Sequence, residues 1–229
     1  SSLSRMGTDY IDLYQLHNPR LDTIRRDEVF DTLEALVREG KVRHYGVAIG
    51  LDIGWQEEGE TAMQERDVET LQIIYSILEQ QPARSFFPIS REKQTGFLSR
   101  VPHASEILTD RFATGLSSFS ANDQRAYRTQ QWLDEAMRKR EQVLFVARET
   151  GRTLAQAAIQ FCLAQETIAS VLPNITTMEE LAEYAAAPDT PPLSSEELRY
   201  LYGLYDSNFG LEHVLTAGAS AQGEQSSRV

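Results

Sequence analysis

The sequence predicts an α/β fold in which parallel strands alternate with helices. Short apolar runs rich in strand-forming residues recur along the chain, and segments with apolar residues at three-and-four spacing stand between them. This alternation is typical of βαβ units, whose strands run parallel. With 229 residues, of which 41% are hydrophobic, the chain can bury a full core without a metal ion or a disulfide.

Five segments are expected to be strands. The first is the apolar run YIDLYQL at Tyr10–Leu16, which follows the turn-like residues Met6–Asp9. The other four, in chain order, are Val42–Ile49, Thr70–Tyr75, Gly96–Val101 and Ala169–Leu172.

Helices are expected between and after these strands. Asp27 can cap a helix that runs to about Glu39, where Gly40 is a suitable C-cap. The further helices are expected, in chain order, at Gly59–Arg66, Phe86–Gln94, Thr129–Thr150, Leu154–Ala164, Thr177–Ala187 and Ser194–Tyr205. Ser195 is expected in a capping position of the last one.

The chain is expected to form one domain over residues 1–209. The tail, 210–229, is rich in Ala, Gly, Ser and Gln and is expected to be disordered. A polar stretch over residues 102–128 is longer than most connections in compact domains, which predicts that it is either functional or mobile.

Composition narrows the classes of partner. The formal net charge of −12 disfavours nucleic acid and anionic membrane surfaces, because such partners are bound by clustered Lys and Arg, and it leaves a small-molecule ligand. No apolar run reaches the roughly 18 residues of a membrane span, and no leader is visible. The single cysteine, Cys162, cannot form an internal disulfide and is expected to pack in the core, which suits a reducing cytoplasm.

The most informative stretch runs from Leu3 to Val47. It contains GTDYIDLYQLHNP at a strand and EALVREGKVRHYGV at the following helix and strand. This pattern resembles the aldo-keto reductase family, and the likeness extends to about Gly210. The resemblance implies a (β/α)8 barrel of aldo-keto reductase type. Because eight units need about 250 residues, the chain is expected to hold an incomplete barrel with about five parallel strands.

The resemblance also implies an activity. Family members are NAD(P)H-dependent oxidoreductases that reduce aldehydes or ketones to alcohols, with hydride from the nicotinamide and a proton from a tyrosine. Of the family's Asp, Tyr, Lys and His tetrad, only the histidine has a matching position here, His17. His17 also ends a predicted strand, where barrel enzymes place their chemistry, although a purely structural role at the strand end is the alternative.

Matching positions suggest a nicotinamide site. Gln72 stands where the family has a glutamine that binds the carboxamide, and an amide can both donate to and accept from another amide. Ala48 and Ile49 replace the usual Ser and Asn, so two of the family's hydrogen-bonding side chains for the carboxamide are absent. Arg100 replaces an aromatic residue that stacks on the nicotinamide; it can stack, pair with a phosphate or a carboxylate, or lie on the surface.

Further along the fourth strand's exit, Pro102 and Ala104 keep the family pattern for the cofactor loop. Glu106 replaces a glycine there, which raises the cost of a positive φ.

The adenosine end of the cofactor is expected near Asn174, Glu180 and Glu183. Relatives that prefer NADP carry Lys or Arg near the first two positions, because a 2′-phosphate needs positive charge. The acidic residues here therefore favour NADH within NAD(P)H. Glu183 matches a residue that contacts adenine, and a solvated role is the alternative. No metal site is expected.

The sequence also allows two alternative functions. A non-catalytic or regulatory aldo-keto reductase-like subunit would keep the barrel without turnover. An inactive truncated barrel would expose two strand edges. The substrate, beyond being a small carbonyl compound, and the oligomeric state are not predicted.

Overall fold

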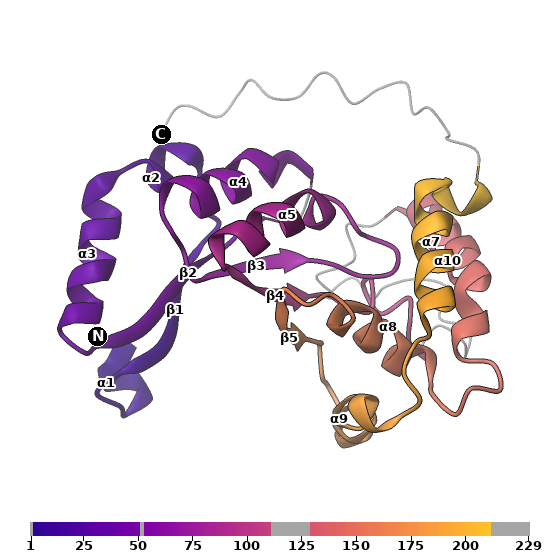
Figure 1. The fold of residues 1–229 in the computed structure, drawn as a ribbon. Helices are drawn as coiled ribbons and strands as arrows, with labels where there is room; N and C mark the ends of the chain where they lie inside the picture. Colours follow the sequence, from indigo (N-terminus) through magenta and orange to yellow (C-terminus); the bar gives the residue numbers. More distant parts are fainter. Residues whose placement is uncertain (1, 51–52, 111–128, 212–229) are drawn as a thin grey trace.

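A computed structural model describes residues 2–50, 53–110 and 129–211. Its centre is a five-stranded, wholly parallel sheet in the order β1-β2-β3-β4-β5 (Figure 1). The strands are β1 (Ile11–His17), β2 (Val42–Ala48), β3 (Thr70–Ile74), β4 (Gly96–Arg100) and β5 (Ile168–Leu172). Each strand lies within one residue of its expected bounds, so the predicted α/β class with five parallel strands is confirmed.

The helices of the described part are mostly those expected. They are α1 (Ser2–Met6), α2 (Leu21–Ile24), α3 (Asp27–Arg38), α4 (Gln56–Glu65), α5 (Ala83–Lys93), α7 (Gln130–Val143), α8 (Leu154–Leu163), α9 (Met178–Ala185) and α10 (Ser195–Asp206). Short 3₁₀ turns occur at η1 (Ile53–Trp55), η3 (Leu144–Val146), η4 (Ala187–Asp189) and η5 (Asn208–Gly210).

Helix α7 is shorter than the sequence suggests. It was expected to continue to Thr150 but ends at Val143 and passes into η3. The carbonyl oxygen of Val146 accepts from Arg152 Nε at 2.7 Å and from Thr150 Oγ1 at 3.2 Å. These side-chain donors take the place of the Thr150 N–H at the end of η3, so the chain does not return to an α-helix after it.

The cap of α10 also differs by one residue. Ser194, not Ser195, is the N-cap, and it forms a capping box with Glu197. Helices α8 and α9 begin with the same device, at Thr153 with Gln156 and at Thr177 with Glu180.

One face of the sheet is packed and the other is open among the described residues. Leu71, Ile73 and Phe97 alternate onto the side that the helices cover and are fully buried. On that side α3 contacts β2, α8 contacts β5, and α4 packs on α5 (Figure 1). Gln72 points to the other face and is half-buried. The open face therefore carries the amide of Gln72.

The core behind the sheet is aromatic. The ring of Tyr75 stacks on Phe161 with centroids 5.2 Å apart and meets the edge of Phe87 at 5.3 Å. Cys162 lies in this core, where its Sγ donates to the carbonyl oxygen of Tyr75 at 3.1 Å. Burial raises the pKa of the Cys162 thiol to about 12. The prediction that this cysteine is a core residue is confirmed.

Among the described residues, none of the helices combines the length and the apolar character that crossing a bilayer requires. The same part of the chain holds no cluster of three or more His, Cys, Asp or Glu side chains that could bind a metal ion. Residues 111–128 of the long polar stretch, and 212–229 of the expected tail, lie outside the described residues.

Candidate functional site

Three positions form one row across the carboxyl ends of neighbouring strands. His17 of β1 is the register partner of Ala48 of β2, and Ala48 is the partner of Gln72 of β3. Because adjacent strands lie about 4.8 Å apart, the backbones of His17 and Gln72 are separated by about 10 Å. The structure therefore brings these two predicted residues together at one end of the sheet, with only an alanine between them.

The imidazole of His17 is exposed at the mouth of the sheet. The chain turns sharply after it, since Asn18 has a φ of 51° and its N–H donates to the carbonyl oxygen of Ala48 at 2.7 Å. Within the described residues the His17 ring makes no hydrogen bond or ion pair. Its nitrogens are thus available to a ligand lying over the end of β1.

The amide of Gln72 is held from the side by Gln15. Gln72 Nε2 donates to Gln15 Oε1 at 3.1 Å, and Gln15 Nε2 donates to Thr70 Oγ1 at 3.4 Å. Gln15 and Thr70 sit opposite Gly46 of the intervening strand. A Cβ atom on Gly46 would lie 2.1 Å from Thr70 Oγ1 and 2.4 Å from Thr70 O, so only glycine leaves room for this chain of amides.

Sequence reasoning singled out Gln72 but missed Gln15. The signal was present, because Gln15 stands two residues before His17 and strand alternation puts both on the same face.

Arg100, the last residue of β4, crosses the sheet. Its Nη2 donates to the carbonyl oxygen of Ile49, which follows β2. Its Nε is buried and has no hydrogen-bond partner among the described residues. Burial lowers the pKa of the Arg100 guanidinium. Arg100 is thus half-buried and hydrogen-bonded across the sheet.

Pro102 and Ala104 belong to a loop with unusual backbone geometry. Ala104, Ser105 and Glu106 all have positive φ, of 48°, 58° and 71°. Each such residue costs about 1–3 kcal/mol unless its surroundings hold it. All three are buried, and the buried Arg140 donates from Nε to Ile107 O at 3.0 Å in the same loop. The positive φ expected to be costly at Glu106 is thus observed and is held by packing.

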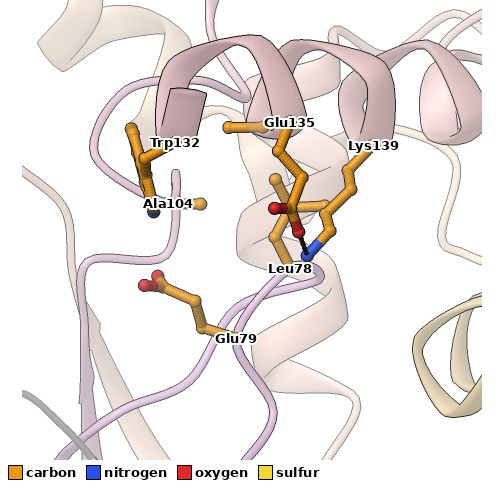
Figure 2. Close-up of a pocket in the computed structure, with 7 residues that line it drawn as sticks. Leu78, Glu79, Ala104, Trp132, Glu135 and Lys139 are labelled. Carbon is orange, nitrogen blue, oxygen red and sulfur yellow. Dashed lines mark ion pairs between the residues drawn. The ribbon is translucent and has the colours of Figure 1, made fainter. Parts of the chain in front are cut away.

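Ala104 does not join the row at the strand ends. It lines a separate cavity of about 130 Å³ under α7, which Figure 2 shows. The cavity lies between the segment after β3 and helix α7, and its lining residues are Leu78, Glu79, Ala104, Trp132, Glu135, Ala136 and Lys139. Two of them, Glu135 and Lys139, form an ion pair at 2.7 Å.

His103 in the same loop is a packing residue. Its ring lies 4.5 Å from that of Tyr184, and its Nε2 is 3.3 Å from the carbonyl oxygen of Ala155. Burial lowers the pKa of His103 to about 4, so the ring is neutral at physiological pH.

The three residues expected near an adenosine lie around α9. Asn174 is exposed between β5 and α9. Glu180 accepts through Oε2 from the N–H of Thr176 at 2.7 Å and of Thr177 at 3.2 Å, as the capping box of α9 requires. Glu183 Oε1 accepts from Thr153 Oγ1 at 2.5 Å, which ties α9 to the start of α8. Both carboxylates therefore have a structural task.

Comparisons with known proteins agree on one family. The model of the aldo/keto reductase family matches residues 1–206. The uncharacterised oxidoreductase YqkF of Bacillus subtilis is 28% identical over 201 residues, which is 87% of this chain and 62% of that protein. A probable voltage-gated potassium channel subunit beta of Oryza sativa is 25% identical over 206 residues, 86% of this chain and 62% of that protein.

Solved structures show the same likeness. The holo form of the aldo-keto reductase AKR11C1 from Bacillus halodurans superposes with a TM-score of 0.69 at 30% identity, covering 89% of this chain and 64% of that one. The chain thus spans somewhat under two thirds of the length of these relatives, whose fold is the (β/α)8 barrel. The prediction from the sequence is confirmed: the chain belongs to the aldo-keto reductase family.

Proposed function

We propose that the protein is an NAD(P)H-dependent oxidoreductase that reduces aldehydes or ketones to alcohols. The observation that carries the proposal is the row formed by His17, Ala48 and Gln72 at the carboxyl ends of three parallel strands. Ligands of parallel α/β folds bind at this end, where the loops that follow the strands converge. An imidazole without a hydrogen-bond partner among the described residues, and an amide held by Gln15, are suitable there for a carbonyl substrate and a nicotinamide.

His17 would position the carbonyl. An N–H of its ring can donate to the carbonyl oxygen, which orients the substrate and favours negative charge developing on that oxygen. The proton itself would come from a tyrosine that matches no position of this sequence.

Gln72 would hold the nicotinamide carboxamide. Its Nε2 is fixed by Gln15, while its amide oxygen accepts no hydrogen bond among the described residues. That oxygen can accept from the carboxamide NH₂ of the cofactor. When bound, the reduced nicotinamide supplies the hydride for the carbonyl carbon. Arg100 and Pro102 complete the proposed cofactor set on the β4 side, and Ala104, which lines the separate cavity under α7, is not part of it.

NADH is the preferred cofactor in this proposal. Asn174, Glu180 and Glu183 offer no cation for a 2′-phosphate, and the two carboxylates would repel it. Residues 1–209 form the proposed domain, and a cytoplasmic location is in keeping with the buried free thiol of Cys162.

A second candidate is a non-catalytic or regulatory subunit. It is favoured by the likeness to the channel subunit beta of Oryza sativa and by Ala48 and Ile49, whose side chains cannot hydrogen-bond a carboxamide. Cofactor binding without carbonyl-dependent oxidation of NADH would select this candidate.

The test is oxidation of NADH at 340 nm with a panel of short aldehydes and ketones, using a protein that joins this chain to the barrel strands that carry the tyrosine, as wild type and as His17→Gln. We expect the His17→Gln rate to fall by about 100-fold while NADH affinity stays unchanged, because the imidazole acts on the carbonyl. Equal rates in both proteins, or no oxidation with any carbonyl, would contradict the reductase proposal.

A further inference from the structure

Arg100 occupies a position from which it can reach a ligand over the row of His17 and Gln72. Gln72 is in register with Leu98, and Arg100 stands two residues further along β4, so it points to the same open face about 7 Å nearer the mouth. Its side chain passes over β3, and its Nη2 bonds to Ile49 O after β2. The guanidinium therefore reaches the end of β2, the strand next to the one that carries His17.

The donors of this guanidinium are poorly satisfied. A guanidinium has five N–H donors, and the described residues offer it one acceptor, Ile49 O. Its Nε is buried without a partner, and no carboxylate of the described part forms an ion pair with it. The nearby side chains of Ala48 and Ile49 cannot accept a hydrogen bond.

Two buried arginines of the described part show which hydrogen-bond acceptors Arg100 lacks. Arg152 bonds to the carbonyl oxygens of Val146, Pro191 and Pro192 and pairs with Glu197. Arg140 bonds to Ile107 O and lies 3.8 Å from a carboxylate oxygen of Glu141. Arg100 is half-buried and has fewer acceptors than these two arginines, so several of its N–H donors are available to an anion.

We propose that Arg100 binds the anionic group, a carboxylate or a phosphate, of a small carbonyl substrate whose carbonyl oxygen lies at His17. A planar guanidinium with free N–H donors matches the paired oxygens of either group, and burial strengthens the pairing. The proposal rests on the proposed function in taking the ligand to be the substrate. It narrows the substrate class to acidic carbonyl compounds. The neutral carboxamide of the cofactor is the competing ligand for the same donors.

The experiment measures anion binding without cofactor or turnover, so its failure is distinguishable from that of the proposed function. The purified chain is titrated by calorimetry at low ionic strength with pyruvate, with its neutral counterpart pyruvamide, and with inorganic phosphate. Pyruvate tests the carboxylate source and phosphate the phosphate source. We expect at least one anion to bind saturably, more weakly as salt is added, and pyruvamide to bind at least tenfold more weakly than pyruvate.

Three variants locate the site. Arg100→Met is expected to weaken anion binding by about tenfold or more. Arg100→Lys keeps the positive charge but loses the planar pair of N–H donors that can bind a carboxylate with two hydrogen bonds, so it should retain phosphate binding better than pyruvate binding. This variant replaces Arg100→Met in the test if the Met variant does not fold. The matched control is Arg91→Met, an exposed arginine of α5 paired with Glu166, which should bind as wild type.

Three results would overturn the proposal. They are the absence of binding of either anion to wild type, unchanged anion binding in Arg100→Met (or unchanged pyruvate binding in Arg100→Lys, if the Met variant does not fold), and pyruvamide binding as tightly as pyruvate.

Discussion

Gln72 donates a hydrogen bond to Gln15 across an entire strand. The two amides belong to β3 and β1, and they meet at 3.1 Å over Gly46 of β2. The missing side chain of Gly46 is what lets them meet. This contact engages the amide nitrogen of Gln72 and leaves its amide oxygen without a donor among the described residues.

Removing Gln15 should therefore weaken NADH binding without removing a proposed ligand residue. Gln15→Met leaves the Gln72 amide unheld, and the loss of one hydrogen bond corresponds to an about threefold to tenfold weaker Kd. Fluorescence titration with NADH measures it. Gln64→Met on the exposed face of α4 is the control and should bind as wild type. Equal NADH affinity in Gln15→Met and wild type would show that the amide chain has no role in binding.

Gly46→Ala should destabilise the fold. Its Cβ would lie 2.4 Å from the backbone oxygen of Thr70, so β2 and β3 must separate, at a cost of about 1–3 kcal/mol. In α10, Gly203→Ala meets nothing within 4 Å and should stabilise by about 0.5–1 kcal/mol. Urea unfolding of both variants measures the change in the free energy of unfolding, which should fall in Gly46→Ala and rise in Gly203→Ala. A neutral Gly46→Ala would mean that the strands approach less closely than the structure has them.

Arg152 should be among the most important side chains for stability. It links η3, the segment before α10 and Glu197, and its removal takes a donor from the buried carbonyl oxygen of Val146 and leaves the largely buried Glu197 carboxylate without its ion-pair partner. We expect Arg152→Met to lower the free energy of unfolding by about 3–5 kcal/mol. The exposed Arg199→Met should change it by less than about 0.5 kcal/mol. Comparably small changes in the free energy of unfolding of both variants would contradict a stabilising role of the Arg152 contacts.

His103 should make stability depend on pH in the acid range. Burial lowers its pKa to about 4 from an ordinary value of 6.5. Between these values the unfolded state takes up a proton that the folded state does not. Stability from His103 is therefore fully present above pH 6.5 and is lost as pH falls toward 4, by a total of about 3 kcal/mol.

The measurement compares urea unfolding of wild type and His103→Gln at several pH values from 7.5 to 4. The variant replaces the ring with an amide that does not titrate, so its loss of stability over this range should be smaller. The same pH dependence in both proteins would assign the effect to other groups.

The elements and the row of strand-end residues could be predicted from the sequence for a simple reason. Apolar runs mark the strands, and parallel strands bring their carboxyl ends to one edge, so His17 and Gln72 had to lie close together. The roles of individual donors depend on register and rotamer. Neither periodicity nor the family pattern could show that Gln72 bonds to Gln15 or that Arg100 turns back to Ile49.

Tertiary contacts account for the other differences. The helix expected up to Thr150 is not continued beyond η3, where Arg152, from outside the helix, binds the carbonyl oxygen of Val146. Glu180 reads as a ligand residue in the family pattern, yet its carboxylate also serves the capping box at Thr177. A capping box is visible in a sequence as a Thr followed three residues later by Glu, so the role of Glu180 at the start of α9 can be predicted from the sequence.

The central claim is that the row at the strand ends, with Gln72 as its amide, binds a nicotinamide cofactor. Titration of the chain with NADH and NADPH, followed by cofactor fluorescence and by the shift in Tm, tests it most directly. The account predicts saturable binding of NADH, weaker binding of NADPH, and an about tenfold loss of NADH affinity in Gln72→Met but not in Gln64→Met. Failure of the wild-type chain to bind either cofactor, or equal binding in Gln72→Met, would contradict it.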